Sequence, residues 1–396
     1  MIDLYLEYTK DVVSPERFRK WAAIHAIGAA VERRVWTRFN INRCYPNMFV
    51  FLVGPPGTGK TQALRPAQVL LRKADAVTLS PNDVTKQSML DAMKKSPKVF
   101  MDNGLPSDYH YLDLIVPELS NFMSEYDAAL AGMLTDLWDC GPVNEETRRS
   151  GNGSGMITNP GVAMIAGTAT KNLGKTISGD LWGQGFMARV ILVYSAEVIN
   201  SDPFMVSSFS EDIERELVQG FERLGEMSGE MTWDEEAKDA MRAWRAGGHK
   251  PVPNHNKLAE YNIRRWLHCA KLAMIAALAD ERMIVYKEDF DLALSWLLEA
   301  EIEIPEIFKD MNQHGDNEIL EEMHSQMLTV FLSSGRRAIS AQWVYSFLSK
   351  RVASHSIARM IEVAEASGML VRSAGTSGTD ATYIPKVSGA LTPDIV

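Results

Sequence analysis

A glycine-rich stretch from Gly54 to Gln62 holds the residue types that phosphate chemistry requires. Its glycines let the backbone turn tightly and point N–H groups inward, Lys60 can reach the β- and γ-phosphates, and the Thr61 hydroxyl can coordinate Mg²⁺. The pattern is that of a P-loop, so it predicts ATP and Mg²⁺ as the bound groups. The predicted nucleotide-binding residues are Gly54, Pro55, Pro56, Gly57, Thr58, Gly59, Lys60, Thr61 and Gln62.

Two elements must position this turn. The apolar run Phe49 to Val53 predicts a buried strand before it, and the glycine-free segment Gln62 to Lys73 predicts a helix after it. The phosphates would then lie at a helix N-terminus, where unpaired N–H groups and the helix dipole favour anions. The alternative, a chance glycine-rich turn, is disfavoured because every position of the motif is filled.

A second apolar run, Tyr111 to Val116, predicts a strand that ends in Pro117 and Glu118. An acid at this position can orient the attacking water or hold Mg²⁺ beside the γ-phosphate, as a Walker B element does. Glu118 is therefore the predicted catalytic acid and, with Thr61, a predicted metal-binding residue. The usual motif has Asp where this chain has Pro117. In the alternative interpretation Glu118 caps the following helix, and another acid such as Asp113 is the base.

A third strand is predicted at Val162 to Ala166, followed by Thr168 and Thr170. A hydroxyl at the end of the strand beside the Walker B strand can contact the γ-phosphate or its water, the role called sensor 1. Both threonines are predicted catalytic residues, and the sequence does not choose between them.

Arg189 directly precedes another apolar strand, Val190 to Tyr194, and follows a glycine-bounded turn. An arginine held there can project from one subunit into the nucleotide of its neighbour, as an arginine finger does. The alternative is an ordinary surface ion pair.

A β-hairpin is predicted from Val143 to Arg149 and Met156 to Thr158, across a polar turn at Ser150 to Gly155. Arg148 and Arg149 near its tip are predicted to grip the nucleic-acid backbone in the channel of a ring-shaped ATPase. The alternative is a solvated turn that carries two arginines.

The composition restricts where the chain acts and what it binds. Its 396 residues carry a net charge of −10, so nucleic-acid binding must come from local basic features. No stretch is long and apolar enough to suggest a membrane span, and the N-terminus lacks the pattern of a signal peptide. Three widely spaced cysteines fit a reducing compartment. We expect a cytoplasmic protein.

The sequence also predicts three elements outside these motifs, from weaker local patterns. Ser14 is the predicted N-cap of a helix with an apolar stripe, Val77 to Leu79 a short strand, and Asp83 to Lys94 a helix capped near Ser80 or Asn82.

Glu211 to Asp310 is predicted as almost entirely helical. Its most regular part, Ala259 to Ala279, has an apolar face that includes Ile263, with Arg264 or Arg265 as a possible sensor 2.

The C-terminal part has the order of a winged helix, a DNA-binding variant of the helix-turn-helix. Its predicted elements are helices at Asp316–Leu332, Ser340–Ser349 and Ser354–Ala366 and strands at Met369–Ser373 and Ala381–Ile384. Between Ser333 and Lys386 there are seven basic and three acidic residues, a local charge of +4. Arg351 and Arg359 are the predicted DNA contacts. The alternative is a module that binds protein.

The predicted fold class is an α/β P-loop NTPase core, a parallel sheet with flanking helices, to which helical and winged-helix parts are attached. We expect a helical extension at 1–40, the ATPase core at 41–200, a helical lid at 201–312, a winged-helix domain at 313–388 and a tail at 389–396.

Together these motifs resemble the helicase-like P-loop ATPases that phages and prophages encode, often next to or fused with a primase. The matching segments are Gly54 to Thr61, Val116 to Phe122, Leu134 to Arg149, Asn159 to Thr170 and Gly185 to Tyr194. The resemblance covers about three quarters of the chain, and Pro117 departs from it. It implies a hexameric ring related to AAA+ and superfamily 3 helicases, with DNA in its channel and a primase or other replication partner.

Three functions compete. The first is an ATP-driven DNA helicase or translocase. The second is a helicase loader or replication initiator that binds DNA without unwinding it. The third is a DNA-binding regulator that uses the nucleotide as a switch. Strand displacement, ATPase without displacement, and nucleotide binding without turnover would distinguish them.

Overall fold

The structure is a computed structural model that divides into two compact units, Met1–Phe308 and Lys309–Val396. It describes residues 1–81, 85–102, 104–123, 127–141, 157–177, 185–200, 202, 204, 209–253, 255–335, 337–352, 354–373 and 381–386. The predicted hairpin tip, with Arg148 and Arg149, lies outside the described residues. None of the helices within these ranges is both long and apolar enough to cross a membrane.

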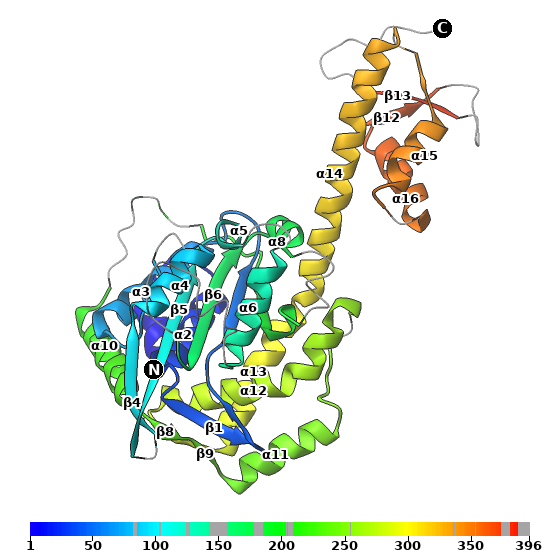
Figure 1. The fold of residues 1–396 in the computed structure, drawn as a ribbon. Helices are drawn as coiled ribbons and strands as arrows, with labels where there is room; N and C mark the ends of the chain where they lie inside the picture. Colours follow the sequence, from blue (N-terminus) through cyan, green and yellow to red (C-terminus); the bar gives the residue numbers. More distant parts are fainter. Residues whose placement is uncertain are drawn as a thin grey trace. The chain divides into compact units, whose positions relative to one another are not determined.

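The first unit is built around a five-stranded sheet in the order β4-β5-β6-β3-β7 (Figure 1). Its strands are β3 (Phe49–Val53), β4 (Pro97–Asp102), β5 (Leu105–Val116), β6 (Pro160–Thr168) and β7 (Val190–Tyr194). Four strands are parallel, and β4 pairs antiparallel with β5 at the edge. All residues of β3 are buried, as expected for a central strand covered on both faces. The expectation of a parallel-rich α/β core is confirmed.

The antiparallel edge strand is a difference from the prediction. The predicted strand at Val77 to Leu79 contributes a single bridge, between Leu79 and Asp113, while β4 forms a hairpin with β5. The signal for this hairpin is the Asn103-Gly104 pair, a favoured two-residue turn between extended segments.

The helix after the predicted strand at 77–79 also begins later than predicted. It is α4 (Lys86–Lys94), and its cap is Thr85 rather than Ser80 or Asn82. Thr85 and Ser88 form a reciprocal capping box with Ser88 in place of the usual Glu or Gln, so the sequence signal was weak.

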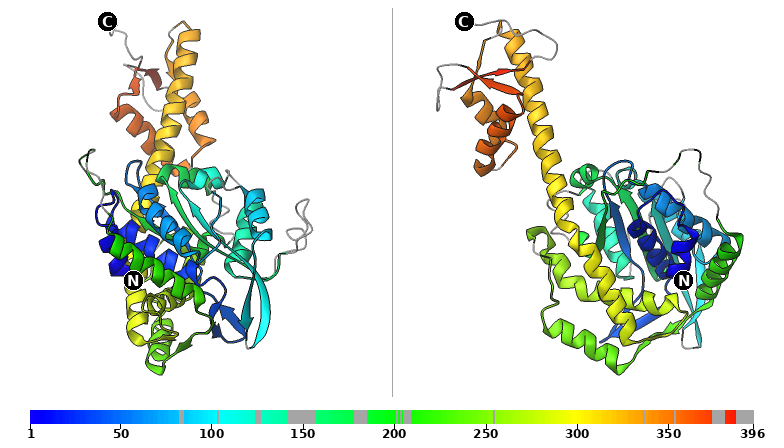
Figure 2. Two further views of the ribbon diagram at one scale, coloured as in Figure 1. Left: turned by 90° about the vertical axis from the view of Figure 1, so that its left-hand side faces the viewer. Right: turned by 180° about the vertical axis from the view of Figure 1, so that it is seen from behind.

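A layer of helices packs against one face of the sheet. It contains α1 (Ile2–Tyr8), α2 (Glu16–Ala30), α3 (Lys60–Ala74) and α10 (Glu211–Glu226), which lie together as the blue and green helices of Figure 2. Trp21 and its apolar neighbours on α2 are buried, as predicted. The N-cap of α2 is Pro15, not Ser14, and the Ser14 side chain is buried beside Gly59.

The other elements around the sheet are shorter. They are α5 (Leu119–Phe122), α6 (Ala128–Trp138), α8 (Thr170–Thr176) and the 3-10 turn η1 (Met187–Arg189). A separate small sheet has the order β2-β1-β8, so Val35 to Phe39 form a strand outside the core sheet. Its strands are β1 (Val35–Phe39), β2 (Asn42–Cys44) and β8 (Gly229–Glu230).

The segment predicted as almost entirely helical contains short strands as well. Its elements are β8, β9 (Thr232–Trp233), α11 (Glu235–Ala246), η2 (Asn256–Leu258), α12 (Ala259–Ala279), β10 (Ile284–Val285) and α13 (Lys287–Ile302). The predicted buried face of α12 is partly wrong, since Ile263 is 65% exposed while Arg265, His268 and Lys271 are buried. Each of these polar side chains has a hydrogen-bond partner, which permits its burial.

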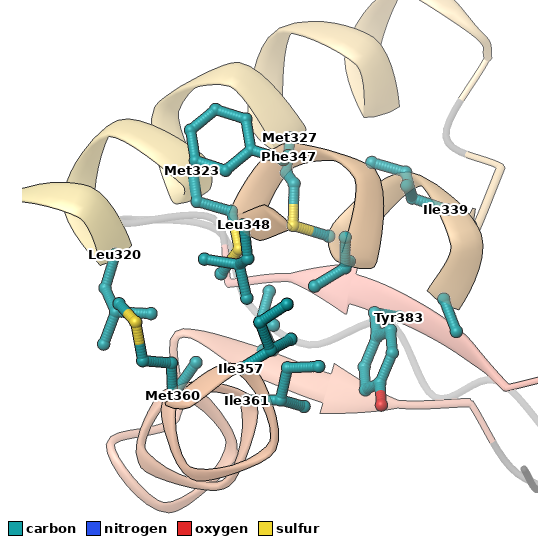
Figure 3. Packing of buried hydrophobic residues seen from close by; sticks show 14 of the residues in the cluster. Leu320, Met323, Met327, Ile339, Phe347, Leu348, Ile357, Met360, Ile361 and Tyr383 are labelled. Carbon is teal, nitrogen blue, oxygen red and sulfur yellow. The ribbon is translucent and has the colours of Figure 1, made fainter. Parts of the chain in front are cut away.

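The second unit combines helices with an antiparallel sheet in the order β11-β13-β12. Its elements are α14 (Ile304–Ser333), which begins in the first unit, β11 (Ile339–Ser340), α15 (Ala341–Ser349), α16 (Ser354–Ala366), β12 (Leu370–Arg372) and β13 (Thr382–Pro385). Its core joins Met323, Leu348, Ile361 and Tyr383 (Figure 3). Ser340 caps α15 by accepting a bond from the Trp343 N–H at 3.4 Å.

Candidate functional site

The glycine-rich turn connects β3 to α3. It leaves the strand after Val53, and the helix begins at Lys60, two residues before the predicted start. Gly57 and Gly59 adopt φ angles of 84° and 74°, a left-handed conformation that glycine adopts without strain. The turn therefore delivers the N-terminus of α3 to the carboxyl edge of the sheet.

Close packing fixes two sides of the turn. A Cβ atom on Gly54 would lie 2.1 Å from the carbonyl oxygen of Ser195, and one on Gly59 would lie 2.2 Å from that of Val13. A Cβ atom on Gly57 would meet nothing within 4 Å. The turn is thus held by β7 and by the segment before α2, while its Gly57 side is open to a ligand.

Lys60 is buried against the turn it follows. Its Nζ atom donates to the carbonyl oxygens of Gly54 and Pro55, each at 2.8 Å, and to the Thr58 hydroxyl at 3.3 Å. Burial lowers the pKa of Lys60, and the negative charge of Glu118 opposes this shift. The ammonium group is therefore held at the turn and lies within electrostatic range of the predicted catalytic acid.

Glu118 lies at the same edge of the sheet as the turn. The parallel register pairs Val53 with Thr168, and Val116 with Ala166, so β3, β5 and β6 end together. A Cβ atom on Gly167 would lie 2.6 Å from the carbonyl oxygen of Pro117 and 3.4 Å from the Cβ atom of Lys60. The small residue at 167 lets the end of β5 approach the lysine.

The side chain of Glu118 does not cap α5. Its Oε1 atom accepts hydrogen bonds from the Ser120 hydroxyl and from the Asn172 side-chain amide, both at 3.1 Å. Asp113, the alternative acid, is fully buried and paired with His25 at 2.7 Å. The structure therefore leaves Glu118, and not Asp113, available beside the turn.

Asn172 is a residue that the sequence reasoning missed. The predicted sensor residues Thr168 and Thr170 are both buried, and the Thr168 hydroxyl donates to the carbonyl oxygen of Ala169 at 3.2 Å. Asn172, in the first turn of α8, reaches Glu118 instead. The signal that could have predicted it is a polar side chain in a helix that starts at the end of β6.

Arg189 lies at the opposite edge of the sheet. The adjacent Val190 pairs with Phe49, the first residue of β3, so Arg189 is about five residues, roughly 16 Å, from the turn. Its guanidinium is buried, forms an ion pair with Asp139 and donates to the carbonyl oxygen of Gly185 at 2.8 Å. Within one chain, Arg189 does not join the turn.

The described residues contain no group of three or more His, Cys, Asp and Glu side chains placed to hold a metal ion. A magnesium ion bound with a nucleotide needs few protein ligands, because phosphate oxygens and water complete its coordination. The Thr61 hydroxyl and Glu118 are donors of the right type, and both belong to the segments that meet at this edge.

The predicted DNA contacts in the second unit are ion-paired. Arg351 lies 2.8 Å from Glu322, and Arg359 lies 2.5 Å from Asp316, both acids on α14. From Lys309 to Val396 the unit has eight basic and nine acidic residues. The local charge of +4 is thus offset once the acids of α14 are included.

Compared with models of protein families and with curated protein sequences, the chain matches none of them.

Proposed function

We propose that this chain binds ATP at the Gly54–Thr61 turn and hydrolyses it, with Glu118 as the general base. The observation that supports this most is the convergence of the turn, Lys60 and Glu118 at the carboxyl edge of β3, β5 and β6. The carboxyl edge of such a sheet is the usual place for a ligand. The α/β core would then be a P-loop NTPase core.

Each group in the site has a role in this proposal. The N–H groups of the turn and of the first turn of α3 bind phosphate oxygens, and Lys60 exchanges its carbonyl partners for them. Glu118 takes a proton from the attacking water, while Asn172 holds the carboxylate in position. Mg²⁺, held by Thr61 and Glu118, would supply charge neutralisation at the phosphates.

We further propose that hydrolysis drives movement on DNA, as in the ring helicases that the sequence resembles. Arg189 fits this assembly because it lies about 16 Å from its own turn, so any contact with nucleotide would be made in a neighbouring subunit. The second unit has the element order of a winged helix. Its eight basic and nine acidic residues favour the alternative in which this unit binds protein.

The test compares Lys60→Ala with Lys73→Ala, a control on the same helix whose side chain is exposed and paired with Glu214. Lys60→Ala should lower ATP turnover by roughly 10²-fold or more, because it removes a preorganised phosphate donor. Lys73→Ala should match the parent. Equal turnover by Lys60→Ala and the parent, measured as phosphate release, would refute the site.

A further inference from the structure

The first unit has a hollow of about 680 Å³ whose lining contains none of the residues of the proposed ATP site. It is walled by the β1–β2 hairpin, β8, β9, α11 and α12, and the labels of β1, β8, β9 and α11 lie in the lower part of Figure 1. Four cationic side chains and one acid, Glu230, line it. The cationic residues are Arg38, Lys238, Arg242 and Arg245. In a chain of net charge −10, this lining is a local concentration of cationic side chains.

Aromatic side chains form the floor of the hollow. Phe39 packs edge-on against Trp266, with ring centroids 5.4 Å apart, and against Trp233 at 5.9 Å. The guanidinium of Arg245 lies 4.3 Å from the centre of the Trp266 ring. A nucleic-acid base can stack on such aromatic rings while its phosphate binds the neighbouring cationic side chains.

The cations can exchange their present partners for phosphate. Arg38 pairs with Glu230 at 3.3 Å, Lys238 with Glu235 at 2.7 Å, and Arg242 with Asp239 at 2.8 Å, all on the surface. Such exposed pairs contribute little free energy. For Arg245, the described part of the chain holds no carboxylate within ion-pair distance.

A second hollow, of about 530 Å³, lies next to the first, and Phe39, Asn42 and Trp266 line both. It adds Arg43 and Arg264 to the lining, together with the buried Lys271 and the acid Asp139. Cationic side chains therefore line two neighbouring hollows, which offers phosphate contacts to more than one nucleotide.

We propose that single-stranded nucleic acid binds along these hollows, with phosphates at Arg242 and Arg245 and a base stacked at Trp266. A duplex hides its base faces and would leave the aromatic floor unused, and an acidic peptide would need the cations alone. The proposal deepens the proposed function by placing the strand, but strand binding here does not depend on ATP.

The test is the fluorescence anisotropy of a labelled oligothymidylate with the full chain, without nucleotide, at several salt concentrations. The double variant Arg242→Gln with Arg245→Gln should bind more weakly, and its log–log salt slope should be smaller by about 1.4, which is about 0.7 for each of two lost phosphate contacts. Trp266→Leu should weaken binding roughly 5- to 150-fold through lost stacking.

A matched control is Arg215→Gln, because Arg215 is also an exposed helical arginine paired with an aspartate three residues earlier, Asp212 at 3.2 Å. It should bind the strand as the parent does. Trp266→Phe keeps an aromatic ring and should recover part of the affinity that Trp266→Leu loses. This recovery would show that Trp266→Leu weakens binding without unfolding the protein.

Three results would overturn the proposal. The first is an unchanged affinity and salt slope in the arginine double variant, and the second is equal binding of Trp266→Leu and the parent. The third is displacement of the oligonucleotide by thymidine monophosphate at equal phosphate concentration, which would make the hollow a mononucleotide site. Because no ATP is present, failure of the ATPase proposal would leave these results unaffected.

Discussion

The contact between Asn172 and Glu118 joins the ends of two strands through one hydrogen bond of 3.1 Å. In the proposed hydrolysis Glu118 is the general base, and the hydrogen bond from Asn172 would hold its carboxylate within reach of the attacking water. The hydroxyl of Thr168 is directed to a backbone carbonyl instead. We therefore expect Asn172 to contribute more to catalysis than Thr168.

Asn172→Ala should lower kcat roughly 10- to 100-fold with little change in KM for ATP, because the amide orients the base and does not bind the substrate. Thr168→Val, which is nearly the same size, should lower kcat less. Steady-state ATPase assays of both variants measure the difference. A larger loss in Thr168→Val would return the sensor role to the threonine.

At the scale of elements, α12 fixes the amino end of the sheet through buried polar groups. His268 is bonded through Nε2 to the carbonyl oxygen of Ala188 at 2.9 Å, so a neutral ring must carry its hydrogen on Nε2. Lys271 donates to the carbonyl oxygen of Asn47 at 2.9 Å. Burial lowers the pKa of His268 to about 3.

This pKa predicts a loss of stability in mild acid. Between pH 6.5 and 3 the unfolded chain takes up a proton at His268 and the folded chain does not, so the free energy of unfolding falls as the pH falls. From pH 6.5 to 5 the loss amounts to about 2 kcal/mol. His268→Gln keeps a donor without titrating.

Urea unfolding at pH 7 and pH 5 checks this prediction. The parent should lose about 2 kcal/mol more between these pH values than His268→Gln. An equal loss in both proteins would show that His268 is accessible to protons in the folded state.

The elements that the sequence predicts well have strong local patterns. The apolar run of β3, the helix at Ala259 to Ala279 and the helix predicted at Ser340 to Ser349 each depend on adjacent residues. The pairing of β1 with β8 joins residues almost two hundred positions apart in strands too short to show periodicity. The burial of Arg265 likewise depends on Glu301, 36 positions away. Long-range partners of this kind leave no local signal.

For the candidate site, the turn with Lys60 and the acid Glu118 could be predicted because fixed spacing identifies them. Asn172 could not, since its role depends on where α8 begins relative to β5. Asp113 could be excluded as the base only after its pairing with the buried His25 was known.

At the scale of the whole molecule, the position of Arg189 bears on assembly. The arginine lies at the edge of the sheet opposite the turn, paired with Asp139. If the chain forms a ring, Arg189 must exchange this partner to reach the nucleotide of a neighbour. An arginine finger is worth roughly 10³ to 10⁵ in rate in other phosphoryl-transfer systems.

Mixing two inactive variants tests this position. Arg189→Ala should bind ATP but hydrolyse it very slowly, and Lys60→Ala should not hydrolyse it. A mixture can form interfaces that pair an intact Lys60 with an intact Arg189, so ATPase activity should partly return. No recovery in subunits shown to exchange would make Arg189 a structural ion pair.

The proposed function requires that ATP binds at the Gly54–Thr61 turn and that Glu118 activates the water. The most direct measurement is the identity of the nucleotide that Glu118→Gln retains after incubation with ATP and Mg²⁺ and removal of free nucleotide. Gln keeps the shape of the side chain without its basicity, so the variant should retain ATP while the parent releases ADP and phosphate. Hydrolysis by Glu118→Gln at the parent's rate, or no bound nucleotide in either protein, would contradict the proposed function.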